Sequence, residues 1–209
     1  MGLIELLFNN PAAFFVLVFL LLYSIIAHEV AHGWVAHLFG DDTALRYGRL
    51  TLNPVPHIDP IGALLLLFVG FGWAKPVPVN YYAFRNRSGL LCVALAGCAA
   101  NILIAAVAMF LMQFKAVSLN PGLSLILPDL IMINIMLGSL NLIPIPPLDG
   151  SKVLMSFLPF RAQEKLAMIE PYGFFILIIL VITGVLRPVI FLMQNLIYAL
   201  ISLPFVFFR

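Results

Sequence analysis

The residues best suited to chemistry in this sequence form the run HEVAH, from His28 to His32. Two histidines four positions apart lie on the same face of a helix, so both imidazoles can reach one metal ion, and neutral imidazole is a good zinc ligand. Glu29 follows the first histidine directly, where it can take a proton from an attacking water whose pKa a bound metal lowers. The spacing therefore predicts a hydrolytic zinc site with His28 and His32 as ligands and Glu29 as the base.

A catalytic zinc site needs three protein ligands and one open position, so a further ligand must come from elsewhere in the chain. The best candidate is Asp149, near the end of the run NLIPIPPLDG, residues 141–150. The prolines of this run stop a helix and leave extended backbone, which is tolerated at membrane depth only inside protein or around a watery cavity. The alternative is that Asp149 caps a helix beginning near Ser151, although that role leaves the prolines unexplained.

The composition indicates the kind of scaffold that must position these residues. Of the 209 residues, 63% are hydrophobic and 10% are charged, whereas soluble domains carry about 25% charged residues. A soluble protein of this length could not cover so much apolar surface, but a lipid bilayer can solvate it. We therefore expect an all-α polytopic membrane protein. The net charge of +2 and the absence of a basic stripe indicate no nucleic-acid partner.

Five apolar segments are expected to cross the bilayer, at residues 11–39, 89–114, 124–143, 172–186 and 189–208. The apolar piece Gly62–Trp73 is too short to span and is expected to be a re-entrant or strand-like element next to the active site. The polar stretch 151–170 is expected to link two spans. The sequence thus predicts one integral membrane domain, 1–209, with a core at about 11–155 and a C-terminal helix pair at about 170–208.

The basic residues predict the orientation, because cytoplasmic loops of membrane proteins are enriched in Lys and Arg. The start MGLIELLFNN lacks the basic region of a cleavable signal peptide, so the first span is expected to be permanent. If the N-terminus lies outside and the short piece dips in and returns, nine basic residues lie inside and two, Lys115 and Arg187, lie outside. We therefore expect a multi-pass protein of the cell membrane whose active site opens toward the cytoplasm.

Other polar residues near the two motifs leave alternatives open. Asn141 lies on the helix face of Asn134 and could hydrogen-bond the substrate or a developing oxyanion, or only a neighbouring helix. His57 and Asp59 stand before the short apolar piece. They could gate or support the metal site, and the alternative that we favour is a solvated loop. Asn101, among small residues, is interpreted as a helix-packing residue.

HEVAH at the end of one helix and NLIPIPPLDG at the end of a later one together resemble the paired signature of the site-2 protease family of intramembrane zinc metalloproteases. The runs GRLTLNPVPHIDPIG and GWAKPVPVN are also similar to its compact prokaryotic members, and the resemblance covers about 25–154. It implies one zinc ion held by His28, His32 and Asp149, with Glu29 as the base.

The same resemblance implies a substrate and a way of binding it. The expected substrate is a single-span membrane protein, cleaved within or near its transmembrane helix after partial unwinding. It would pair with an extended edge of the enzyme, for which the segments around Leu50 and Val77 are candidates. Many relatives carry a PDZ domain between the third and fourth spans, where this chain has only the short link 115–122, so no regulation by such a domain is expected.

Two other functions are consistent with ionisable residues inside a membrane protein. A metal-ion transporter would use the ligands without needing a base, and the position of Glu29 argues against it. A catalytically inactive scaffold that binds membrane helices would not need all three ligands and the base, which are intact in this sequence.

Overall fold

The computed structural model describes residues 3–69, 72–80, 84 and 87–206. In these residues the chain is helical and contains no strand. The helices are α1 (Leu3–Asn9), α2 (Pro11–Leu38), α3 (Thr43–Arg46), the 3-10 turn η1 (Val55–His57), α4 (Pro60–Val69), α5 (Arg87–Leu111), α6 (Lys115–Ser118), α7 (Pro121–Asn141), α8 (Asp149–Phe157), α9 (Phe160–Ile182) and α10 (Arg187–Val206).

Among the described residues, five helices are long and apolar enough to cross a membrane: α2, α5, α7, α9 and α10. An α-helix satisfies its own backbone hydrogen bonds, which is the requirement for crossing lipid. The prediction of an all-α, multi-pass membrane protein is thereby confirmed. The first three spans begin and end within a few residues of the expected positions.

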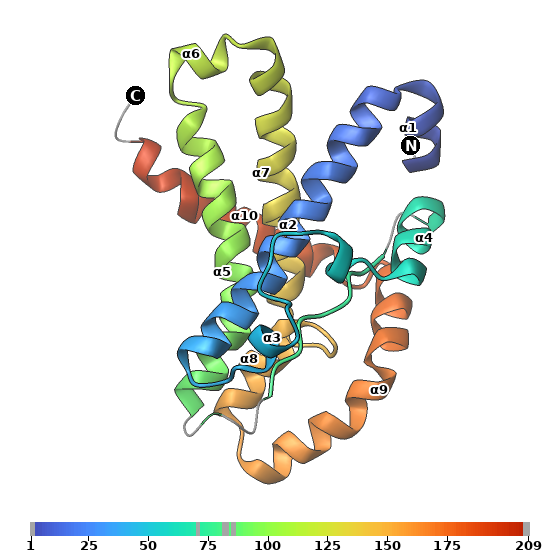
Figure 1. The fold of residues 1–209 in the computed structure, drawn as a ribbon, viewed down its shortest axis with the longest axis vertical. Helices are drawn as coiled ribbons and strands as arrows, with labels where there is room; N and C mark the ends of the chain where they lie inside the picture. The colour runs from blue at the N-terminus through green and yellow to red at the C-terminus, as the bar shows by residue number, and fades with distance from the viewer. Residues whose placement is uncertain (1–2, 70–71, 81–83, 85–86, 207–209) are drawn as a thin grey trace.

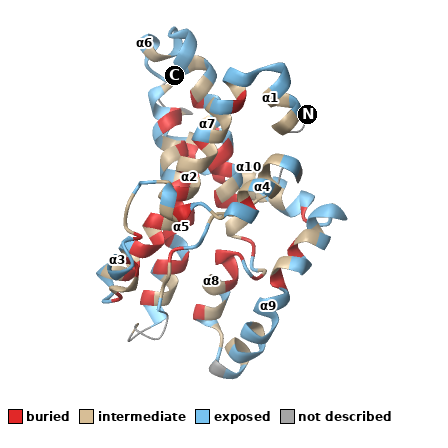
Figure 2. Ribbon diagram, turned by 45° about the vertical axis from the view of Figure 1, so that its right-hand side comes forward, coloured by how far each residue is buried: buried red, intermediate tan, exposed pale blue. Residues whose placement is uncertain are grey.

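Helices α2, α5 and α7 contact one another and form the central bundle, and α6 joins α5 to α7 at its upper end (Figure 1). Buried residues follow these three helices, whereas much of α9 is exposed (Figure 2). Small buried residues on α5, among them Gly97 and Ala105, allow the close helix approach that packing in lipid requires. The bundle is therefore the rigid part that can hold a site.

The helix that carries HEVAH is bounded by local signals. The side chain of Asn10 accepts a hydrogen bond from the Ala13 amide at 3.1 Å, and Pro11 follows at the first helical position, where its missing N–H costs nothing. The helix ends at Leu38, just before Gly40, whose positive φ of 93° favours glycine. The HEVAH residues consequently lie in the second half of α2, toward the lower end of the bundle (Figure 1).

The prolines of the second motif end α7 at Asn141, and a tight turn leads into α8 at Asp149. A Cβ atom on Gly150 would stand 2.4 Å from the carbonyl oxygens of both Leu142 and Ile143. Only glycine therefore allows the start of α8 to fold back against the end of α7. This return brings Asp149 to α5, because α8 packs against that helix.

The structure corrects the expected strand-like form of the piece Gly62–Trp73. Its described N-terminal part belongs to the short helix α4, while 72–80 is extended, as the prolines of KPVPVN predict. The reason lies just upstream, where Asp59 accepts hydrogen bonds from the amides of Ile61 and Gly62 at 2.9 Å. This cap and Pro60 at the first position start a helix, and it has only 10 residues, too short to span.

The polar stretch 151–170, expected to link two spans, is helical in α8 and in the first half of α9. Its charged residues lie on helix surfaces instead of in a loop. The fourth span was expected to begin at 172, but α9 already begins at Phe160 and contains Pro171. The helix changes direction along its length (Figure 1). A proline is tolerated inside a membrane helix when its surroundings satisfy the freed backbone groups.

Candidate metal centre

Helices α2 and α8 bring together the three predicted ligands. His28 Nε2 lies 2.9 Å from Asp149 Oδ2, His32 Nε2 lies 3.0 Å from the same oxygen, and the two Nε2 atoms are 3.1 Å apart. All three residues are buried. Within the described part of the chain, they form the one group of His, Cys, Asp or Glu side chains whose ligand atoms converge closely enough to hold a metal ion.

The opposite ring nitrogen of each histidine is held by an oxygen. His32 Nδ1 lies 2.7 Å from the backbone carbonyl of Val93, and His28 Nδ1 lies 2.6 Å from Oδ1 of Asn101. Each Nδ1 therefore carries the hydrogen and donates it, which leaves the lone pair of each Nε2 facing Asp149. Hydrogen bonds of this kind orient metal-binding histidines in proteins.

The donor set fits a metal ion. Two Nε2 lone pairs and a carboxylate oxygen face one another at about 3 Å, and a cation is needed to relieve their repulsion. Two imidazoles and one carboxylate form a ligand set of catalytic zinc. Gly97 leaves room for the rings, since a Cβ there would lie 2.4 Å from His32 Nε2 and 2.5 Å from His28 Nε2.

Asp149 meets the histidines and does not cap α8 with its side chain. Leu148 occupies the cap position of that helix, while Asp149 Oδ2 lies 2.9 Å from His28 Nε2 and 3.0 Å from His32 Nε2. Burial alone would raise the pKa of Asp149, but the two imidazoles next to its carboxylate outweigh burial and lower the pKa. The carboxylate is therefore held in the ionised form that a metal ligand needs.

Glu29 lies on α2 beside the ligands and is held by a different part of the chain. Its Oε2 accepts a hydrogen bond from the backbone amide of Val77 at 2.8 Å. Gly33, one residue past the second ligand, permits this approach, because a Cβ there would lie 2.9 Å from Val77 Cγ1 and 2.6 Å from Leu50 Cδ2. The two segments expected to offer edges to a substrate thus both pack against α2 near the site, and the amide of Val77 already binds Glu29.

His57 is fully buried, so the favoured alternative of a solvated loop is wrong for this residue. Its Nε2 donates to the Thr51 carbonyl at 2.9 Å, and its own carbonyl accepts from the Lys75 amide at 2.8 Å. Arg49 donates to the Lys75 carbonyl at 2.6 Å. His57 and Arg49 therefore anchor the extended segment that reaches Glu29, while Asp59 caps α4.

The two predicted asparagines of α7 differ in their surroundings. Asn141 is partly buried and its Nδ2 donates to the Leu137 carbonyl of its own helix at 3.1 Å. Asn134 is completely buried and donates to Ser24 Oγ and to the Leu130 carbonyl. The shared helix face is therefore real, but only Asn134 lies in the centre of the bundle.

Of three positions that contact the predicted ligands, Val93 and Gly97 were missed from the sequence, and Asn101 was interpreted only as a helix-packing residue. Val93, Gly97 and Asn101 follow one another at intervals of four on α5, so they form one stripe facing His28 and His32. A glycine and an asparagine four apart inside an apolar span are a signal that could have been followed. The role of Val93 could not, because it acts through its backbone carbonyl.

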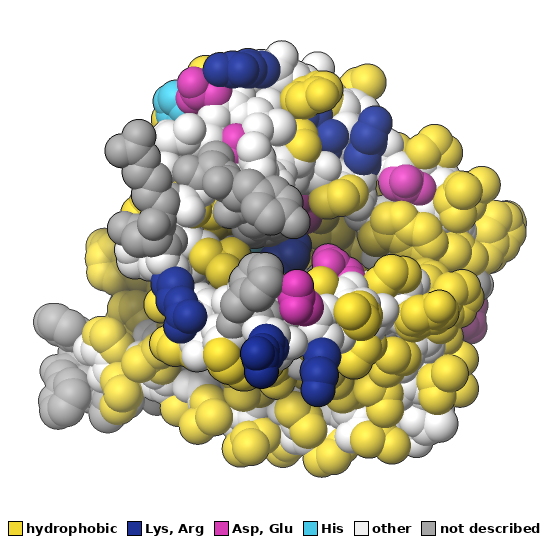
Figure 3. Space-filling view, turned by 90° about the horizontal axis from the view of Figure 1, so that it is seen from below, with side chains coloured by type: hydrophobic (Ala, Val, Ile, Leu, Met, Phe, Trp, Pro, Cys, Tyr) yellow, Lys and Arg dark blue, Asp and Glu magenta, His cyan; other side chains and the backbone are white. Residues whose placement is uncertain are grey.

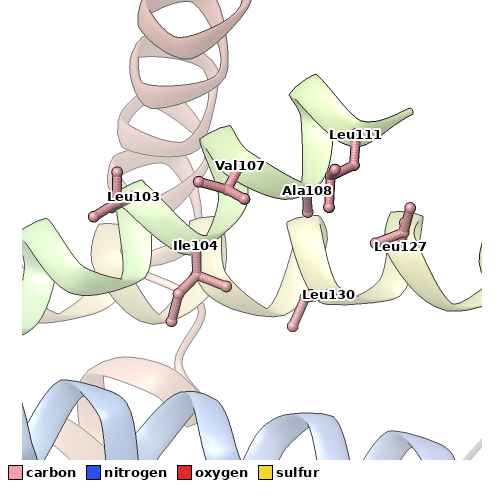
Figure 4. Close-up of a pocket in the computed structure, with 7 residues that line it drawn as sticks. All are labelled: Leu103, Ile104, Val107, Ala108, Leu111, Leu127 and Leu130. Carbon is pink, nitrogen blue, oxygen red and sulfur yellow. The ribbon is translucent and has the colours of Figure 1, made fainter. Parts of the chain in front are cut away.

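The surface separates a polar end from apolar flanks. Viewed from below, charged side chains surround a hollow at the end where α3, α8 and the start of α9 lie (Figures 1 and 3). Elsewhere, a cavity of about 280 Å³ lies between α5 and α7 (Figure 4). It is lined by aliphatic side chains alone, and none of the three predicted metal ligands lines it. That cavity offers no group for catalysis.

The chain is similar in sequence to known zinc metalloproteases. The model of peptidase family M50 matches residues 112–182, which include Asp149. YwhC of Bacillus subtilis strain 168, named as a candidate zinc metalloprotease, is 38% identical over 187 residues, covering 86% of this chain and 85% of that protein. The zinc metalloprotease MJ0392 of Methanocaldococcus jannaschii is 28% identical over 204 residues, covering 96% of this chain and 50% of that protein. No solved structure shows a significant match to the chain.

The three converging side chains and the apolar helices are those of a membrane-embedded metalloprotease. The similarity to YwhC places the chain in the same class. The chain belongs to peptidase family M50, as the resemblance to the site-2 proteases indicated.

We predict that Gly97→Ala weakens zinc binding on the order of 10- to 100-fold, the range seen when groups around metal ligands are altered. The new methyl group would occupy the space of both imidazole rings. Competition with a fluorescent zinc chelator measures the effect on detergent-purified protein. Gly138→Ala is the matched control, because its Cβ would meet its nearest neighbour, Ile102 Cγ1, at an ordinary 3.4 Å. Equal zinc affinities for both variants would contradict the role of Gly97.

Proposed function

We propose that this chain is an intramembrane zinc endopeptidase that hydrolyses peptide bonds within or near the transmembrane helix of a membrane protein. The observation that carries the proposal is the convergence of His28, His32 and Asp149 beside Glu29 in a bundle of membrane-spanning helices. Buried ionisable groups are costly in such a bundle and usually mark a functional site. The whole chain, 1–209, is proposed to form the protease domain, with its core at about 11–155 and its C-terminal helix pair at about 170–208.

The proposed chemistry is hydrolysis with one base. Zinc held by His28, His32 and Asp149 would polarise the scissile carbonyl and lower the pKa of the attacking water. Glu29 takes the proton from that water and returns it to the leaving amine. The Val77 amide holds one oxygen of the Glu29 carboxylate in place, and the other oxygen can carry the proton.

The proposed substrate is a single-span membrane protein, which must expose extended backbone to reach the ligands. A helix hides its carbonyls in internal hydrogen bonds, so the substrate has to unwind locally before attack. Asn141 is the proposed donor to the developing oxyanion. One of its two amide hydrogens is used by Leu137, and the second is proposed to face the substrate.

The proposed orientation has the N-terminus outside and the site opening toward the cytoplasm. Basic residues of α3, α8 and α9 (Arg46, Lys152, Arg161 and Lys165) lie on elements at the end of the molecule opposite α6, which carries Lys115 (Figure 1). This asymmetry is typical of a cytoplasmic face.

We expect Glu29→Gln to keep one zinc ion per chain and to abolish cleavage, because glutamine has nearly the same shape but cannot accept the proton. Zinc content by elemental analysis and cleavage of a purified single-span substrate by electrophoresis measure the two effects. Retained cleavage would refute the mechanism. Zinc in both proteins with cleavage by neither, together with metal flux in liposomes, would instead favour a transporter.

Asn141→Ala should lower kcat on the order of 10²-fold, the usual cost of losing one oxyanion donor, with zinc content unchanged. Steady-state cleavage of the same substrate separates kcat from KM. An unchanged kcat would remove Asn141 from the mechanism and leave it as a residue that bonds only its own helix.

The orientation is tested with single cysteines placed at Lys115 and Arg161 in a chain whose native Cys92 and Cys98 are replaced by Ser. In intact cells, a membrane-impermeant maleimide should label the cysteine at position 115 and spare the one at 161. Labelling at 161 and protection at 115 would reverse the proposed topology.

A further inference from the structure

We infer that Asn101 and Asn134 are positioning residues that fix which ring nitrogen of His28 carries its hydrogen, so that Nε2 is free to bind the metal. The inference rests on the proposed function, because it assigns a task to residues around the same site. The side chain of Asn134 hydrogen-bonds to Asn101, Ser24 and Leu130 and to none of the three predicted metal ligands, so its effect reaches His28 through Asn101.

The hydrogen bonds that run from Asn134 through Asn101 to His28 are called the relay here. The relay begins at backbone carbonyls, which can only accept hydrogen bonds. One Asn134 nitrogen, Nδ2, lies 2.8 Å from the carbonyl of Leu130 and 2.9 Å from Ser24 Oγ. Because the Leu130 carbonyl has no hydrogen to give, the NH2 group of Asn134 must face it. The Oδ1 atom of Asn134 is therefore turned toward Asn101.

Asn101 receives its orientation in the same way. Its Nδ2 lies 2.8 Å from Asn134 Oδ1 and 3.2 Å from the carbonyl of Ser24, and both of these atoms are acceptors. With its donor side committed, Asn101 presents Oδ1 to His28 Nδ1 at 2.6 Å. That ring nitrogen must therefore be the donor, and neutral His28 has no hydrogen on Nε2.

Burial makes the relay strict. Asn101 and Asn134 are completely buried, and Ser24 is 2% exposed. If the Asn101 amide were reversed, it would place NH2 against the His28 donor and an oxygen against two acceptors. Each such mismatch would leave a buried polar group without a hydrogen-bond partner, which strongly disfavours the reversed arrangement.

The two histidines are thus fixed by different means. His32 is set directly by the backbone carbonyl of Val93, which no side-chain substitution removes. His28 depends on side chains from α5 and α7, anchored by Ser24 of α2. Substitutions can therefore disturb the tautomer of His28 while His32 keeps its own, which makes the relay testable.

The test compares zinc affinities on the Glu29→Gln chain in detergent, by competition with a fluorescent chelator. Asn101→Leu removes the acceptor for His28 and should weaken zinc binding 10- to 100-fold, and Asn134→Leu should weaken it severalfold. Asn195→Leu, at an exposed position on α10, is the matched control and should leave the affinity unchanged. The visible absorption of the cobalt-substituted protein should shift in Asn101→Leu and stay unchanged in Asn195→Leu.

Asn101→Asp separates positioning from helix packing. Like leucine, aspartate loses the donor to Ser24 and Asn134, so both variants should lower the melting temperature of the protein. Aspartate keeps an oxygen for His28, so Asn101→Asp should bind zinc at least tenfold more tightly than Asn101→Leu. Equal zinc affinities for the two Asn101 variants would overturn the relay, since a purely structural residue makes affinity follow stability.

The outcomes also distinguish the relay from the proposed function. If the native chain binds zinc and cleaves substrate but Asn101→Leu binds zinc as tightly as the native chain, the relay is wrong and the protease stands. If Asn101→Leu loses zinc affinity as predicted while the native chain binds zinc without cleaving, the relay stands and the proposed protease is wrong.

Discussion

The structure depends on one electrostatic constraint, the convergence of two imidazole lone pairs and a carboxylate oxygen within about 3 Å of one another inside an apolar helix bundle. Neither lipid nor apolar side chains can offset the repulsion between these groups. The chain must therefore orient each group by its own hydrogen bonds, and a bound cation must neutralise the repulsion. Other buried polar contacts near the site serve this requirement. The Val93 carbonyl and the Asn101 amide hold the outer edges of the rings, and Asp149 is held ionised between the inner ones.

Helix α5 acts as the wall against which the ligands lie. At intervals of four residues it presents a carbonyl at Val93, an empty space at Gly97 and an amide at Asn101. The same helix packs against α2, α7 and α8, which together supply both histidines, Asn134 and Asp149. A single helix therefore sets the position of all three ligands, and its small residues, by permitting close packing, also determine the chemistry.

The proposed base, Glu29, is held by a different part of the chain from the predicted metal ligands. Glu29 shares α2 with the histidines, but its carboxylate is held by the amide of Val77 in the extended segment 72–80. That segment is in turn fixed at Lys75 by the backbone of His57 and the guanidinium of Arg49. The predicted ligands are thus held by the helix bundle and the proposed base by a loop. A loop can shift without disturbing the packed core.

The sequence by itself determined the membrane class and predicted the ligand set and the base, because these follow from helix periodicity, residue chemistry and hydropathy, which are local properties. HEVAH predicts two ligands on one helix face, and the prolines before Asp149 indicate a non-helical approach to the site. Only the tertiary structure decided which groups surround them. These groups include the buried His57, the stripe on α5 and the Val77 amide that binds Glu29. Their contacts join segments up to 73 residues apart, as in the contact of His28 with Asn101. Such contacts depend on how helices pack, and two of them use backbone atoms, which carry no signature in the residue types.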